Sequence, residues 1–192
     1  AALSPESMLA GIADMESPAG IHDALHCETD FVIARAFSKI AFLDYMISVK
    51  KGDDKIAAGL REDINVLLNE LQLLRNHRST WAKDASKCAF VNSTENAIMS
   101  SLAYTAFASA SMLGIKVEES LMEELSGQIS SYYNLESNEE VKAFILYALS
   151  ANGKANFGYI NRLYRDKNKL FPRSLALLGL MLKSAGKTDM TS

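Results

Sequence analysis

The strongest constraint on this chain is a helical unit that recurs along its second half. In each copy an apolar helix ends at a glycine, and another helix follows after a short turn. The copies span residues 94–114, 138–153 and 172–186. Their final glycines, Gly114, Gly153 and Gly186, lie 39 and 33 residues apart. Periods in this range are typical of stacked supersecondary units, which bury their apolar faces only against one another. The pattern predicts an all-α fold built as a helical array.

The first half of the chain is also helical by its apolar spacing. Recurrence of apolar residues every three or four positions, with start and stop signals, predicts helices over residues 4–15, 29–50 and 53–77. Residues 78–92 lose this periodicity, which predicts a loop. No run alternates as a strand does, and no Pro/Gly/Ser-rich hinge separates two cores. We therefore expect a single helical domain over residues 1–192.

Composition excludes several classes of function. The 192 residues carry 20 basic and 23 acidic side chains, a net charge of −3, and no basic stripe that could neutralise a nucleic-acid backbone. Apolar residues make up 48% of the chain, but polar residues interrupt every run well short of a bilayer span. The segment has no secretory leader pattern. Two cysteines, Cys27 and Cys88, suit either free thiols or one bridge.

The starts of two later helices are also readable. Ser137 is predicted to cap the helix that follows it, with Glu140 as the returning acid of a capping box. Pro172 is predicted to be the first residue of the last helix. Because no partner helix follows that helix before Ser192, we expect the chain to be an excerpt of a larger multidomain protein.

The segment Val141–Thr188 resembles the thioester-domain region of bacterial alpha-macroglobulins. The matching residues are Tyr147-Ala148-Leu149, Gly153, Leu163-Tyr164-Arg165-Asp166, Leu170, Leu175-Ala176-Leu177-Leu178 and Gly186. Upstream, Arg78-Ser79-Thr80-Trp81 resembles the Trp-containing loop of the same family, so the likeness covers roughly residues 27–188. It implies an alpha-alpha toroid, a ring of inner and outer helices shared with terpenoid cyclases and prenyltransferase β-subunits, here as an incomplete ring or superhelix.

The chemistry of that family depends on Cys-x-Glu-Gln, in which the cysteine and the glutamine form an internal thioester. Cys27-Glu28-Thr29-Asp30 stands at the matching place. Asp30 is too short and has no amide nitrogen to expel as ammonia, and Glu28 is one position early. No histidine follows His77 to attack a thioester. The resemblance therefore implies the fold with a degenerate thioester position at Cys27, Glu28 and Asp30, no catalytic residue and no cofactor.

Two other interpretations of this segment remain. Cys27 could act as a nucleophile, because a helix N-terminus lowers a thiol pKa, although a buried leftover cysteine explains it more simply. A metal-like cluster is formed by His22, His26, Cys27 and Asp30. Since no further ligand stands at recognised spacing, we predict no metal.

Two further sets of residues bear on function. Arg75, Arg78, Lys83 and Lys87 surround Trp81 and form a candidate contact loop for another domain or an acidic partner. Acid pairs occur at 53–54, 118–119, 123–124 and 139–140; three of these open helices, where the dipole favours negative charge. Aromatic residues that could line a cavity, but are more often core, are Tyr104, Phe107, Phe144, Tyr147, Phe157 and Tyr159.

The functional hypothesis that follows from the resemblance is a non-enzymatic module of an alpha-macroglobulin-like protein. Its implied partners are other domains of the same chain and proteases, restrained without acylation, in the periplasm or cell envelope. One alternative is an alpha-alpha toroid enzyme acting on a lipid or polysaccharide, which needs a carboxylate with a raised pKa in a cavity. Another is a helical-repeat peptide scaffold with an open concave groove.

Overall fold

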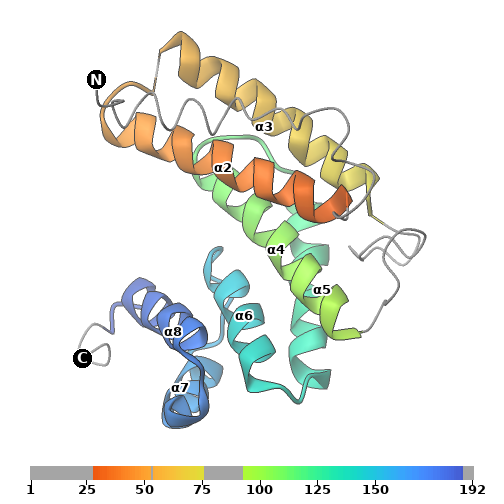
Figure 1. The fold of residues 1–192 in the computed structure, drawn as a ribbon, viewed down its shortest axis with the longest axis vertical. Helices are drawn as coiled ribbons and strands as arrows, with labels where there is room; N and C mark the ends of the chain where they lie inside the picture. Colours follow the sequence, from red (N-terminus) through yellow and green to blue (C-terminus); the bar gives the residue numbers. More distant parts are fainter. Residues whose placement is uncertain (1–27, 53, 76–92, 188–192) are drawn as a thin grey trace, which may run out of the picture. The chain divides into compact units, whose positions relative to one another are not determined.

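The structure is a computed structural model that describes residues 28–52, 54–75 and 93–187 (Figure 1). Within these ranges all regular structure is helical, which confirms the all-α prediction. The elements are α2 (Glu28–Ser48), α3 (Lys55–Leu73), α4 (Ser93–Met112), α5 (Glu119–Leu135), α6 (Glu139–Ser150), α7 (Phe157–Arg165), the 3₁₀ turn η1 (Lys167–Lys169) and α8 (Pro172–Ser184). The helix expected over residues 4–15 and the loop expected over residues 78–92 lie outside the described residues.

The described helices belong to two compact units. The first contains α2, α3 and residues 109–116, and the second contains residues 93–108 and the helices from α5 to α8. The division falls inside α4, which is continuous from Ser93 to Met112. The single domain expected over the whole chain stays a prediction.

In the first unit α2 and α3 lie side by side (Figure 1). The buried residues of α3 recur every three or four positions and form one stripe, made of Ala57, Leu60, Ile64, Leu67, Leu68 and Leu71. Lys39 of α2 is 8% exposed, and its ammonium lies 2.7 Å from the carboxylate of Asp63 on α3. Burial of a charged lysine costs free energy unless the charge is paired. The contact with Asp63 therefore explains how Lys39 can be buried between α2 and α3.

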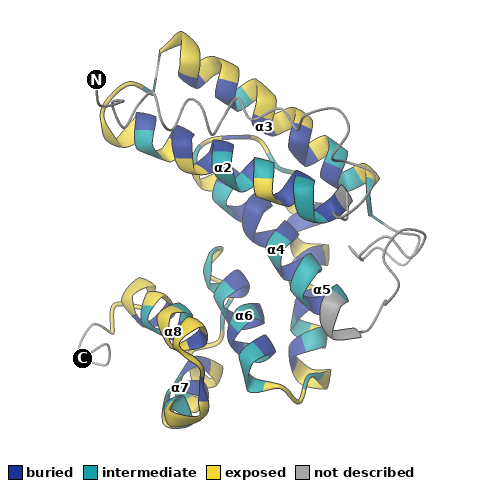
Figure 2. Ribbon diagram, in the orientation of Figure 1, coloured by how far each residue is buried: buried dark blue, intermediate teal, exposed yellow. Residues whose placement is uncertain are grey.

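Helix α4 is buried around its whole circumference in its central part (Figure 2). Six consecutive residues, 103–108, are buried, and six residues exceed one helical turn. Alanine and serine are frequent in this helix. Small side chains let neighbouring backbones approach closely, so the sequence suits a helix enclosed on all sides.

In the second unit each helix from α5 onward packs on the next one along the chain. Alternate helices also meet. Helix α6 packs on α8, and the rings of Tyr133 on α5 and Tyr159 on α7 have centroids 4.6 Å apart. Contacts between both successive and alternate helices are typical of stacked helical hairpins. The unit is therefore repeat-like, while closure into a toroid stays a prediction.

Three helices end in the same glycine turn, as the sequence predicts. Gly114, Gly153 and Gly186 have φ angles of 82°, 65° and 70°. After each glycine, the next N–H donates to a carbonyl near the end of the preceding helix. These bonds are Ile115 to Ala110 (3.1 Å), Lys154 to Leu149 (3.0 Å) and Lys187 to Leu182 (2.8 Å). The pattern is the Schellman motif, in which glycine takes the left-handed position without strain.

Helix α2 ends in the same turn without a glycine. Lys50 has a φ of 59°, and the N–H of Lys51 donates to the carbonyl of Met46 at 2.8 Å. A side chain in the left-handed region costs roughly 1–2 kcal/mol. Gly52, the nearest glycine in the sequence, comes two residues after this strained position.

Candidate functional site

The residues of the degenerate thioester position lie at the start of α2. Cys27 is outside the described residues, Glu28 is the first residue of α2, and Asp30 lies in its first turn. Asp30 is half-buried, and its Oδ1 atom is buried without a hydrogen-bond partner. The helix N-terminus favours its negative charge. That Asp30 replaces a thioester glutamine stays a prediction.

The candidate contact loop is not placed by the structure. Arg78, Trp81, Lys83 and Lys87 lie outside the described residues. The same is true of His22, His26 and Cys88. Among the residues that are described, no three His, Cys, Asp or Glu side chains are arranged to hold a metal ion.

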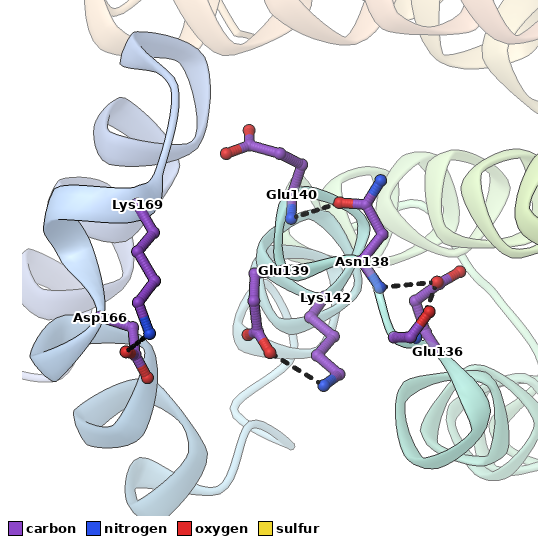
Figure 3. Close-up of polar contacts among 8 residues, drawn as sticks. Glu136, Asn138, Glu139, Glu140, Lys142, Asp166 and Lys169 are labelled. Atoms are coloured by element: carbon purple, nitrogen blue, oxygen red, sulfur yellow. Dashed lines mark hydrogen bonds and ion pairs between the residues drawn. The ribbon is translucent and has the colours of Figure 1, made fainter.

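A network of polar contacts holds the turn between α5 and α6 (Figure 3). The Glu136 carboxylate accepts the N–H groups of Ser137 and Asn138 at 2.8 and 2.9 Å. Asn138 in turn accepts the N–H of Glu140 at 2.9 Å and is the N-cap of α6. The prediction that Ser137 is the cap is wrong. Asn138 stands one residue later, where its side-chain oxygen reaches the orphan N–H of the first turn.

Glu140 bonds to a different helix from the one predicted. Its carboxylate is directed away from Asn138 (Figure 3) and accepts the N–H of Phe171 at 2.7 Å and the hydroxyl of Ser174 at 2.5 Å. Phe171 is the N-cap of α8 and makes no side-chain cap of its own. The capping-box role of Glu140 is therefore wrong. Its carboxylate binds α8, and Glu136 already accepts the N–H of Ser137 that such a box would use.

The contact between Glu140 and Phe171 ties two alternate helices of the array together. A carboxylate from α6 satisfies the start of α8 and also opposes the positive end of its helix dipole. Arg173 of α8 adds a second tie, with its guanidinium 5.0 Å from the ring centroid of Phe144 on α6. Sequence reasoning missed both contacts.

Two ion pairs complete the polar contacts of this region (Figure 3). Asp166 and Lys169 are 2.6 Å apart, and Glu139 and Lys142 are 3.1 Å apart. The hydrogen bond from Lys169 lowers the pKa of Asp166, and the same bond raises the pKa of Lys169. The pair between Asp166 and the exposed Lys169 contributes little to stability, whereas Glu139 and Lys142 are both half-buried.

Acids from three of the four pairs lie at helix starts, whereas Glu123 and Glu124 lie inside α5. Asp54 is the N-cap of α3 and accepts the N–H of Ile56 at 3.1 Å. Glu119 lies in the first turn of α5, and both Glu139 and Glu140 lie in the first turn of α6. These positions agree with the structural interpretation of the acids as helix-opening residues.

The six aromatic residues considered as cavity lining divide between core and surface. Tyr104 and Phe107 are buried, Phe144 and Tyr147 are half-buried, and Phe157 and Tyr159 are exposed. Burial raises the pKa of the Tyr104 hydroxyl. Asn152 lowers that pKa in part, although it does not reach the hydroxyl with hydrogen-bond geometry. The core interpretation holds for Tyr104 and Phe107.

Helix α4 carries polar atoms that have no partner. These are the Asn96 Oδ1, Ser100 Oγ, Ser101 Oγ and Tyr104 hydroxyl atoms. Asn96, Ser100 and Tyr104 follow one another at four-residue spacing and share one side of the helix. An unsatisfied buried polar group costs about 1–3 kcal/mol. The sequence shows serines in an apolar pattern here, but not that their hydroxyls lack partners.

One side of α8 is largely exposed (Figure 2). Its buried stripe consists of Ser174, Leu178, Met181 and Leu182. A second stripe, which we call the α8 outer face, consists of Pro172, Leu175, Ala176, Gly179, Leu180 and Lys183. These residues recur at alternating steps of three and one and therefore share one side of the helix. Leu175 is 39% and Leu180 50% exposed.

Comparisons of the chain with protein families, with curated proteins and with solved structures find no match. None of the described helices has the length and apolar character needed to cross a bilayer. The described structure defines an all-helical protein with repeat-like packing.

Proposed function

We propose that the chain is a non-catalytic packing module, of the kind that forms the thioester domain of bacterial alpha-macroglobulin-like proteins, without the covalent thioester. The observation that carries the proposal is the contact pattern of the second unit, in which both successive and alternate helices pack on one another. Inner and outer helices of a toroid would make these same contacts.

The residues that carry the resemblance support the proposal by their positions. Tyr147 lies in α6, Gly153 takes the left-handed position after it, and Leu163 is buried in α7. Pro172 is the first residue of α8, and Gly186 ends it in the same turn. These five residues lie on helices and turns, which is what the resemblance expects of them.

The proposed role is to pack against sibling domains of a larger envelope or periplasmic protein that binds or restrains proteases. Restraint would then come from conformational change, since Asp30 lacks the amide nitrogen that thioester formation expels. Proteases and sibling domains are the proposed partners.

The test is a thiol titration of the native protein, read by intact mass and repeated after methylamine, after reductant and after denaturation. A Cys27→Ser variant assigns each adduct to Cys27 or Cys88. The proposal expects both thiols to alkylate without methylamine or reductant, either at once or on unfolding. A thiol that stays hidden until methylamine adds to the protein would reveal a thioester and overturn the proposal.

A further inference from the structure

Helices α6 and α8 occupy corresponding places in the array. Each precedes a Schellman turn, at Gly153 and Gly186, and aligning these glycines pairs each α8 residue with an α6 residue. The α8 outer face then corresponds to Glu139, Lys142, Ala143, Leu146, Tyr147 and Ser150 of α6. All of these are buried or half-buried. The face that is covered in α6 is therefore bare in α8.

The elements that pack on α6 show what kind of occupant such a helix takes. Helices α5, α7 and α8 are among them. An apolar stripe on a helix, with residues at steps of three and four, is complementary to a similar stripe on another helix. The α8 outer face occupies positions i, i+3, i+4, i+7, i+8 and i+11 counted from Pro172. Its geometry therefore suits a helix as occupant.

The charges around the α8 outer face favour an acidic occupant. Every charged residue from Lys154 to Lys187 is basic except Asp166, which is paired with Lys169. Lys183 is exposed within the α8 outer face, whereas the Arg173 guanidinium lies over Phe144 of α6 and the Glu140 carboxylate is bound at the start of α8. These basic residues would repel a positively charged partner, whereas they would attract carboxylates to this end of the chain.

We propose that the α8 outer face is a docking surface for an acidic amphipathic helix of a partner domain. Apolar residues of that helix would cover Leu175, Ala176 and Leu180, and its carboxylates would lie near Lys183. The inference rests on the proposed packing function and names the kind of surface on which the module packs.

A designed peptide probes the surface directly. It is a labelled amphipathic helix with leucines at i, i+3/i+4 and i+7 and glutamates beside them, and its control has lysines in place of the glutamates. Fluorescence anisotropy is expected to show binding of the acidic peptide only, with an affinity that falls as salt is raised. Equal binding of the two peptides would overturn the proposal.

A pair of variants tests the location. Ala176→Glu places a charge in the α8 outer face, and Ala58→Glu makes the same change at an exposed position of α3. We expect Ala176→Glu to weaken peptide binding by about tenfold or more, a cost of about 1.4 kcal/mol, and Ala58→Glu to leave it unchanged. Circular dichroism checks that both variants are folded. The same affinity for both variants would overturn the location.

Other occupants give different results. Self-association of the chain alone in analytical ultracentrifugation, lost in Ala176→Glu, would assign the face to a second copy and overturn the proposal. Co-sedimentation with phosphatidylserine vesicles, lost in the same variant, would assign it to a membrane and also overturn the proposal. The thiol titration tests the proposed function independently of peptide binding. If both thiols are free and the peptide does not bind, only the docking proposal is overturned. If a thioester is found and the peptide binds, only the proposed function is overturned.

Discussion

Helices α6 and α8 pack on each other and end in the same turn, but their surroundings differ. Ile145 and Leu178 occupy corresponding positions, and both are buried. Ala143 and Ala176 also correspond, yet Ala143 is fully buried and Ala176 is exposed. Local sequence thus sets the helix and its end, whereas the next neighbour in the array decides which face is buried.

The largest expected effect separates these two alanines. Ala143→Glu would bury an unpaired carboxylate and is expected to cost about 3–5 kcal/mol of folding stability. Ala176→Glu changes an exposed position and should remain within about 0.5 kcal/mol. Urea unfolding followed by circular dichroism measures both. If the two variants lose equal stability, α6 and α8 do not differ in the way that the structure describes.

The next effect concerns the carboxylate that joins the two helices. Glu140→Ala removes the acceptor for the Phe171 N–H and the Ser174 hydroxyl and is expected to cost about 1–2 kcal/mol, as loss of a helix cap does. Hydrogen exchange should become faster in the first turn of α8.

The matched control is the neighbouring acid. Glu139→Ala removes a half-buried ion pair within α6, with Lys142, and should cost about 0.5 kcal/mol and leave exchange in α8 unchanged. Equal effects of the two substitutions on α8 would show that Glu140 does not cap it.

The features that the sequence predicts well are those decided by neighbouring residues. Gly153 and Gly186 end helices because glycine tolerates positive φ, and Pro172 starts one because its missing N–H would be unpaired there. Periodic apolar residues likewise predict the all-helical fold. Each of these signals lies within a few residues of the feature it predicts.

The features that the sequence does not predict depend on distant residues. Glu140 caps a helix that begins near Phe171, a separation that no local motif spans. The exposure of Ala176 depends on whether a further element covers α8. Closure into a toroid is likewise nonlocal, and of the degenerate thioester position only Glu28 and Asp30 fall among the described residues.

A smaller effect compares the helix ends of the two units. Gly153→Ala is expected to cost about 1 kcal/mol, because an added Cβ meets open space and only the φ of 65° is strained. Lys50→Gly removes the corresponding strain from α2 and should stabilise the protein by about 0.5–1 kcal/mol, reduced by the greater freedom of glycine in the unfolded chain. Thermal unfolding measures both changes in stability, which should be a loss in Gly153→Ala and a gain in Lys50→Gly. A loss of stability in Lys50→Gly would contradict the strain at that end.

The smallest effect is a loss of stability at alkaline pH. It extends the comparison to α4, whose central residues are buried, whereas one side of α8 is exposed. Burial raises the pKa of Tyr104 above its ordinary value of 10.0, so the folded state keeps a proton that the unfolded state loses. Stability is therefore fully present below about pH 10 and falls as the pH rises towards the folded pKa. Tyr104→Phe removes a buried hydroxyl that has no hydrogen-bond partner, so it should raise stability slightly at neutral pH and should also reduce the alkaline loss. If burial of this phenol is responsible, the difference in urea midpoint between the two proteins should stay constant below about pH 10 and widen above it. The same decline of both midpoints at alkaline pH would show that another group controls it.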